Sequence, residues 1–289
     1  MFKNTLKTVT LLAGLAGFFV FVGTLLGGVT GLVIGGVLGF GLVGSSYWFS
    51  DHLAVKAARA SEVGPGELGW LQSDLAVLAD RAGITTPRLF ISPDDQPNAF
   101  ATGRNERTAI VCITAGLLTA LDRNEVRGVV AHEVAHVKHR DILIGSIAAA
   151  VATGISMLAN LAMFATMFGG GSDDEESPNP LVLIAVALVA PMAAGVMQMA
   201  LSRSREFEAD RLGAELIGDP RPLASALTKL DRSAHRVTMD VTPARATAYI
   251  VNPLTGREAK FSNLFLTHPP TDARVQRLLA AHGEMAVAR

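Results

Sequence analysis

Three long runs of uncharged, largely apolar residues limit the folds that are open to this chain: residues 9–49, 142–171 and 181–201. A helix needs about 20 apolar residues to cross the hydrocarbon core of a membrane. The first run is long enough for two such helices, with Gly27-Gly28 or Gly35-Gly36 as candidate turns, and the first pair divides it more evenly. The sequence therefore predicts four transmembrane helices. A cleaved signal peptide is the competing interpretation, but the run is too long for one and no clear cleavage site follows.

Basic residues indicate how these predicted helices are oriented. All lysines and arginines lie on one side of the predicted spans. Those that flank the spans are Lys3, Lys7, Lys56, Arg59, Lys138, Arg140, Arg203 and Arg205. The two short loops on the other side contain neither. Because positive charge is retained on the cytoplasmic side, both termini and the charged segments 51–141 and 202–289 are predicted to be cytoplasmic.

Composition excludes some functions. The net charge of −1 gives no reason to expect a nucleic-acid partner. The single cysteine, Cys112, lies in an apolar, β-branched run and is expected to be buried in a strand. It cannot form an intramolecular disulfide.

The segment 51–141 has the pattern of a small mixed domain. Residues 67–82 have apolar residues at helical spacing, and residues 87–92 and 108–114 read as strands. A further helix is expected to begin near Glu125, capped by Asp122 or Asn124.

That helix contains the sequence His132-Glu133-Val134-Ala135-His136. Histidines four residues apart lie on one helix face, close enough to bind one divalent metal ion. Glu133 points about a third of a turn away, where it can take a proton from water instead of binding the metal. The alternative is an ordinary amphipathic helix with two surface histidines.

Two histidines leave a catalytic zinc one protein ligand short. The candidates are His52, His139, His235, His268 and the carboxylates. His139 would have to reach across about two helical turns, roughly 10 Å, so a ligand from a separate helix is needed. Glu206 and Asp210 share one face of such a helix; Glu206 can bind the metal while Asp210 accepts the N–H of a ligand histidine.

Several motifs together resemble the bacterial membrane-bound zinc metalloproteases of the gluzincin family, which also contains the CAAX prenyl proteases. The matching stretches are residues 97–103, 114–118, 132–136, 202–210 and 267–275. The resemblance implies one Zn²⁺ per chain, bound by His132, His136 and Glu206, with Glu133 as general base. It also implies a multi-pass protein of the bacterial inner membrane that hydrolyses peptide bonds of misfolded or damaged membrane proteins. This is a quality-control task linked to stress, in which self-cleavage and cooperation with other membrane proteases are expected.

The predicted fold class is therefore α+β and mostly helical. Residues 1–50 are expected to form two transmembrane helices, 51–141 a cytoplasmic catalytic segment with a small sheet, 142–201 a transmembrane hairpin with an acidic external loop, and 202–289 a cytoplasmic segment with the third ligand.

Further residues are predicted to act on the substrate. His268 is a candidate donor to the oxyanion, supported by the resemblance, and Arg203 is a weaker one. Substrate is expected to dock as an extended strand against an edge of the sheet. The predicted substrate strand is residues 108–114, with Thr108, Ile110, Cys112 and Thr114 along it and Asn98 and Ala99 lining the cleft.

Three alternatives stay open at this point. An intramembrane metalloprotease would bury its metal motif within a span, which the flanking charges Arg123, Glu125, Arg127, Lys138 and Arg140 make costly. A CAAX-type prenyl-protein protease is expected to have more spans enclosing a chamber. A zinc-dependent membrane scaffold without turnover would keep the metal and lack proteolysis.

Overall fold

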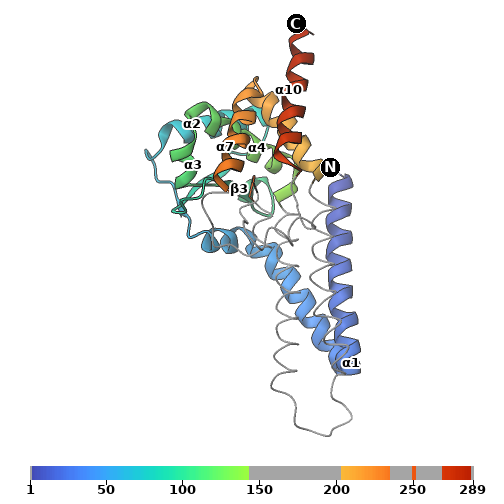
Figure 1. Cartoon of the computed structure of the whole chain (residues 1–289). Coiled ribbons are helices and arrows are strands. Elements are labelled where there is room, and N and C mark those ends of the chain that lie inside the picture. Colours follow the sequence, from blue (N-terminus) through green and yellow to red (C-terminus); the bar gives the residue numbers. More distant parts are fainter. Residues whose placement is uncertain (1, 143–202, 235–248, 252–268, 288–289) are drawn as a thin grey trace. The chain divides into compact units, whose positions relative to one another are not determined.

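The computed structural model describes residues 2–142, 203–234, 249–251 and 269–287 (Figure 1). The chain divides into two compact units. The first unit contains residues 1–48 and 147–198, and the second contains residues 49–146 and 199–289. Each unit is described by itself.

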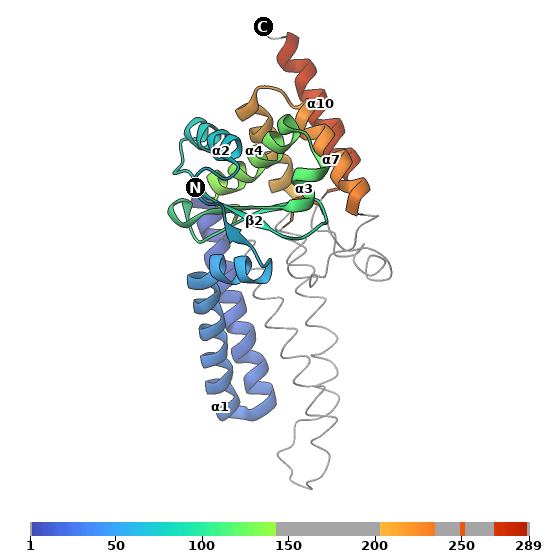
Figure 2. The ribbon, with the colours of Figure 1, turned by 90° about the vertical axis from the view of Figure 1, so that its left-hand side faces the viewer.

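Helix α1, Phe2–Ala57, supplies the described part of the first unit, and its last residues belong to the second. The chain reverses within α1 (Figures 1 and 2), where Gly28 has a left-handed backbone with φ of 54°. The two arms approach so closely that a Cβ on Gly23 would clash with the carbonyl oxygen of Gly31. The predicted turn at Gly27-Gly28 therefore agrees with the structure.

No helix among the described residues has the length and apolar character that crossing a bilayer requires. The third and fourth predicted spans lie largely within residues 143–202, outside the described residues. The four transmembrane helices therefore stay a prediction.

The second unit is built on a four-stranded mixed sheet. Its strands are β1 Ser61–Glu62, β2 Arg88–Ser92, β3 Ala99–Thr102 and β4 Ile110–Thr114, in the spatial order β1-β2-β4-β3. Strand β4 pairs parallel with β2 and antiparallel with β3. The prediction that residues 108–114 form a sheet edge is wrong. All five residues of β4 are buried, as expected for an apolar run in the middle of a sheet, and β3 forms the edge instead.

Alternate residues of β4 serve two hydrophobic clusters. Val111 and Ile113 pack into the main core beneath α2, α4 and α7. Ile110 and Cys112 face the other way, where Phe90, Phe100 and Tyr249 lie with them. Cys112 is fully buried, as predicted, and burial raises the pKa of its thiol to about 12.

Helices cover the main core (Figure 2). They are α2 Gly69–Ala82, α3 Ala115–Ala120, α4 Arg123–His139, α7 Arg221–Ala234, α10 Thr271–Val287 and an unlabelled helix at residues 203–217; a 3-10 turn, η1, spans Glu106–Thr108. The predicted helices at 67–82 and from near residue 125 are present, as are the two predicted strands, each within two residues at either end. The prediction of a mostly helical fold with a small sheet is confirmed.

Local sequence determines where α4 begins and ends. Asp122 caps its first turn, and Glu125 returns a hydrogen bond to the Asp122 N–H, 2.9 Å away, which completes a capping box. The helix ends at Arg140, which adopts a left-handed backbone with φ of 60°. Small residues allow close packing around it: a Cβ on Gly128 would lie 2.9 Å from the Leu223 nitrogen, and one on Gly213 would lie 3.1 Å from the His132 nitrogen.

Candidate metal centre

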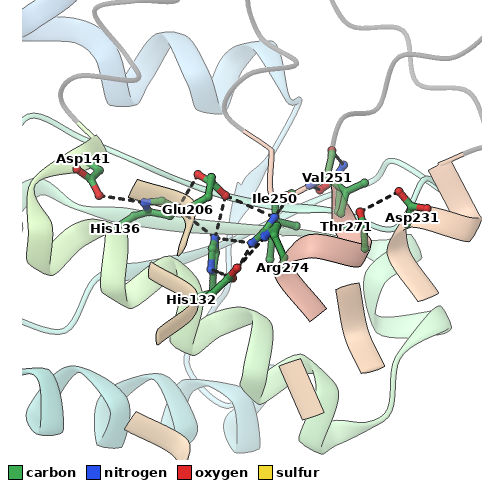
Figure 3. Close-up of polar contacts among 11 residues, drawn as sticks. His132, His136, Asp141, Glu206, Asp231, Ile250, Val251, Thr271 and Arg274 are labelled. Atoms are coloured by element: carbon green, nitrogen blue, oxygen red, sulfur yellow. Dashed lines mark hydrogen bonds and ion pairs between the residues drawn. The ribbon is translucent and has the colours of Figure 1, made fainter. Parts of the chain in front are cut away.

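The structure brings the three predicted metal ligands together (Figure 3). The Nε2 atoms of His132 and His136, one turn apart on α4, are 3.1 Å apart. Glu206, from the helix at residues 203–217, places one carboxylate oxygen 3.6 Å from His132 Nε2 and the other 3.4 Å from His136 Nε2. His132 and Glu206 are buried, and the His136 side chain is 16% exposed.

These separations fit a shared metal ion. Two ligand atoms that each lie about 2.0–2.1 Å from a tetrahedral metal ion are about 3.3 Å apart. The three separations in this site lie within a few tenths of an ångström of that value. Two imidazole nitrogens and a carboxylate are also the donor set typical of a catalytic site with an open position. The residues present therefore fit a tetrahedral divalent cation.

The proton affinities of the two histidines differ strongly. Burial lowers the pKa of His132 to about 4. Burial also disfavours the charged form of His136, but the carboxylates of Glu206 and Asp141 outweigh it and raise that pKa to about 10. Without a metal ion, these carboxylates favour the protonated form of His136. Metal binding requires the neutral ring, so a bound cation would take the place of that proton.

A buried ion pair orients His132. Its Nδ1 lies 3.0 Å from Asp210 Oδ1, so the carboxylate can accept the N–H and leave Nε2 free to bind the metal. Arg274 of α10 donates to both Asp210 oxygens at 2.8 and 2.7 Å. Burial raises the pKa of Asp210, but the Arg274 charge and hydrogen bonds outweigh it and hold the pKa at about 2. Asp210 thus lies where the sequence predicted.

Glu133 lies beside the ligands on α4 and is 2% exposed. Burial and the nearby Glu206 carboxylate raise its pKa to about 7, although the backbone N–H of Ala101 in β3 donates to it. A carboxylate with a pKa near neutrality can both accept and return a proton at physiological pH. Its position next to the sheet edge suits a general base.

The other predicted site residues have different surroundings. Asn98 and Ala99 are fully buried, and the Asn98 amide donates to the Val251 carbonyl at 2.9 Å. Ile110 and Cys112 lie in the central strand. Thr114 caps α3 by accepting a hydrogen bond from the Leu117 N–H.

Two predicted residues, Thr108 and Arg203, are not among the buried ligands, and a third, His268, lies outside the described residues. Thr108 ends the 3-10 turn that precedes β4. Arg203 is exposed. The roles of Arg203 and His268 as oxyanion donors stay predictions.

Sequence reasoning missed two residues of the site. Arg274 lies within a stretch that carries the family resemblance, but nothing local indicates that its side chain reaches Asp210. Asp141 follows the metal helix, and its Oδ2 lies 3.3 Å from His136 Nδ1. In the sequence, only the position of this carboxylate five residues after a ligand histidine indicates the contact.

Comparison with known proteins identifies the family. The pattern described as Peptidase family M48 matches residues 65–282, which include every residue of the site described above. This chain belongs to peptidase family M48. Like its M48 relatives it is a metalloprotease.

Two similar proteins align with this chain over nearly their whole length. A Protease HtpX homolog from Persephonella marina is 45% identical over 279 residues, covering 95% of this chain and 96% of the relative. Another from Methylibium petroleiphilum is 46% identical over 280 residues, covering 96% of this chain and 97% of the relative.

A solved structure has a similar fold. The crystal structure of S. mikatae Ste24p aligns with a TM-score of 0.52 at 18% identity, and it covers 96% of this chain and 65% of that chain.

Proposed function

We propose that this M48 protein is a membrane-bound, zinc-dependent endopeptidase that hydrolyses misfolded or damaged membrane proteins at the cytoplasmic face. The observation that carries the proposal is the convergence of His132, His136 and Glu206 within 4.8 Å of one another, with Glu133 beside them. Two imidazoles and one carboxylate favour zinc over Mg²⁺ and Ca²⁺, which prefer oxygen ligands.

The chain's own residues supply the remaining chemistry. Zinc held by His132, His136 and Glu206 would activate water and polarise the carbonyl that is to be cleaved. Glu133 takes the proton of the attacking water and returns it to the leaving nitrogen. The Ala101 N–H, which donates to Glu133, holds that carboxylate in place. His268 or Arg203 is proposed to donate to the oxyanion.

Substrate is proposed to bind along β3 instead of β4. Part of this edge is already covered, because the Ile250 N–H donates to the Ala99 carbonyl at 3.0 Å. The remaining end, at Ala101, is adjacent to Glu133. A substrate strand paired there would donate to the Ala101 carbonyl, a backbone contact that tolerates many sequences and so suits an enzyme acting on damaged proteins.

Membrane embedding through four spans, with both termini in the cytoplasm, is also proposed. It is supported by the three uncharged runs and by the distribution of lysine and arginine. Large apolar side chains in α1 are exposed as well, among them Phe21 at 62%, Val37 at 69% and Phe40 at 69%. Exposed apolar surface of this kind is typical of contact with lipid or with another protein.

The variant Glu133→Gln tests the proposal. The full chain, purified in detergent, should bind about one zinc ion per molecule and cleave casein or an unfolded membrane protein. Glu133→Gln should retain the zinc and lose cleavage by 100-fold or more, because general-base catalysis contributes on the order of 10²–10⁴. Glu206→Ala should lose both.

The outcomes separate the alternatives. Unchanged degradation of membrane proteins by the Glu133→Gln variant would show that the enzyme assignment is wrong. Zinc binding by the wild type without any cleavage would favour a scaffold. Cleavage confined to prenylated peptides would favour a CAAX-type protease.

A further inference from the structure

We infer that Asp141, held by Arg205, is a positioning residue for the metal ligand His136. Its carboxylate accepts the Nδ1–H of His136 and so presents Nε2 to the metal. This inference rests on the proposed function, since it concerns how the metal is held.

The end of α4 places Asp141. The left-handed backbone of Arg140 turns the chain, and the Arg140 N–H caps the helix by donating to the carbonyls of His136 and Val137. Asp141 comes directly after this turn, with its side chain 6% exposed and Oδ2 3.3 Å from His136 Nδ1 (Figure 3). The turn thus returns the carboxylate toward the preceding helical turn, where the ligand histidine lies.

This contact selects one tautomer of His136. A neutral imidazole carries a single N–H, and a carboxylate can only accept. With the proton on Nδ1, the lone pair of Nε2 faces the other ligands, 3.1 Å from His132 Nε2 and 3.4 Å from a Glu206 oxygen. Carboxylates in this position fix the ring orientation and make the imidazole a stronger ligand.

Arg205 connects this contact to the second ligand helix. It directly precedes Glu206, its side chain is 19% exposed, and its Nε lies 3.9 Å from Asp141 Oδ1. At this distance the two side chains form an ion pair but no hydrogen bond. The positive charge of Arg205 attracts the Asp141 carboxylate and helps to hold it beside His136. The same helix therefore supplies a metal ligand and the charge that supports the partner of another ligand.

The two histidines are supported in parallel ways. His132 contacts Asp210, which is paired with Arg274, and His136 contacts Asp141, which is paired with Arg205. In each case a carboxylate lies between the histidine and an arginine. The second set lies closer to the surface, which makes it accessible to mutation with less damage to the core.

The test measures metal affinity as well as activity. Full-length protein in detergent is stripped of metal and titrated with Zn²⁺ against a chromophoric chelator, and its Co²⁺ form is examined by visible absorption. Asp141→Ala should bind Zn²⁺ about 10–100-fold more weakly, as expected when the partner of a ligand histidine is removed. Its Co²⁺ spectrum should also change, which a merely structural role would not cause.

Conservative variants sharpen the test. Asp141→Asn keeps an oxygen that accepts the N–H but loses the charge, so its affinity should fall between those of wild type and Asp141→Ala. Asp141→Glu should restore part of the affinity, and Arg205→Gln should weaken it less than Asp141→Ala does. Asp80→Asn, at an exposed aspartate of α2, is the matched control and should bind like wild type.

Wild-type Zn²⁺ affinity and an unchanged Co²⁺ spectrum in both Asp141→Ala and Asp141→Asn would overturn the inference while leaving the proposed function intact. Absence of Zn²⁺ binding by the wild type would overturn both.

Discussion

Arg274 is 1% exposed and is among the largest fully buried side chains of the described residues. Its guanidinium donates to Asp210 and, at 2.8 Å, to the Ile250 carbonyl. It thereby connects the carboxylate behind His132 to the segment that covers the end of β3. A charge buried this deeply is tolerated because it is paired with the carboxylates of Asp210 and Glu206, 2.7 and 3.5 Å away.

Removing that charge should destabilise the protein strongly. Arg274→Met leaves the Asp210 carboxylate buried without its counter-charge, which typically costs about 3–5 kcal/mol. Thermal or denaturant unfolding of the purified protein would measure the loss. Arg274→Lys keeps the charge but cannot bond both Asp210 oxygens in the same planar arrangement. Its stability should therefore fall between those of the wild type and Arg274→Met. A loss below about 1 kcal/mol for Arg274→Met would contradict this account.

The packing of helices determines how far Glu206 lies from the histidines. Gly213 lies on the helix of Glu206 and faces the backbone of His132, where an added Cβ would be 3.1 Å from the nitrogen and 3.2 Å from Cα. Neither backbone can move without moving a ligand.

Gly213→Ala should therefore separate the two ligand helices by a few tenths of an ångström. We expect Zn²⁺ affinity to fall on the order of tenfold, about 1.4 kcal/mol, as measured by chelator competition. Gly69→Ala in α2 is the matched control, because nothing lies within 4 Å of its added Cβ. Equal affinities in the two variants would argue against tight control of the metal site by this contact.

The start of α4 should make stability depend on pH. Burial raises the pKa of Glu125, but hydrogen bonds from Lys229, Ser225 and the Asp122 backbone outweigh it, so the net pKa is lowered from 4.5. The stabilisation is fully present above the unfolded-state pKa and is lost as pH falls through the lower folded-state value. The difference in unfolding temperature between wild type and Glu125→Gln should therefore be constant from pH 7 to about 5 and shrink in more acidic buffer. A difference that stays constant down to pH 3 would contradict this assignment.

Across the second unit, the metal ion should act as a cross-link. Its ligands come from α4 and from a helix about 70 residues further along the chain. An ion that binds only the folded state stabilises it by about 2.7 kcal/mol at a concentration 100 times its dissociation constant. Removing metal by dialysis against a chelator should lower the unfolding temperature, and Zn²⁺ should restore it. Glu206→Ala should show little change on chelation. Identical unfolding of the wild type with and without metal would contradict this expectation.

Local sequence patterns predict much of this architecture. The helix of His132 and His136, its cap at Asp122 and the strands near residues 88–92 and 110–114 depend on local spacing and on contacts between near neighbours. Glu206 and Asp210 were predicted from helical periodicity together with the ligand chemistry of zinc. These features need no knowledge of how distant segments meet.

Other features depend on where distant segments pack. The position of β4 in the middle of the sheet, the edge formed by β3, and the contacts of Arg274 with Asp210 and of Arg205 with Asp141 all join residues far apart in the sequence. An apolar run looks the same in a central strand and in a covered edge strand, and a buried arginine has no local pattern to distinguish it from an exposed one. Their roles follow from burial and pairing, which exist only once the helices and the sheet have assembled.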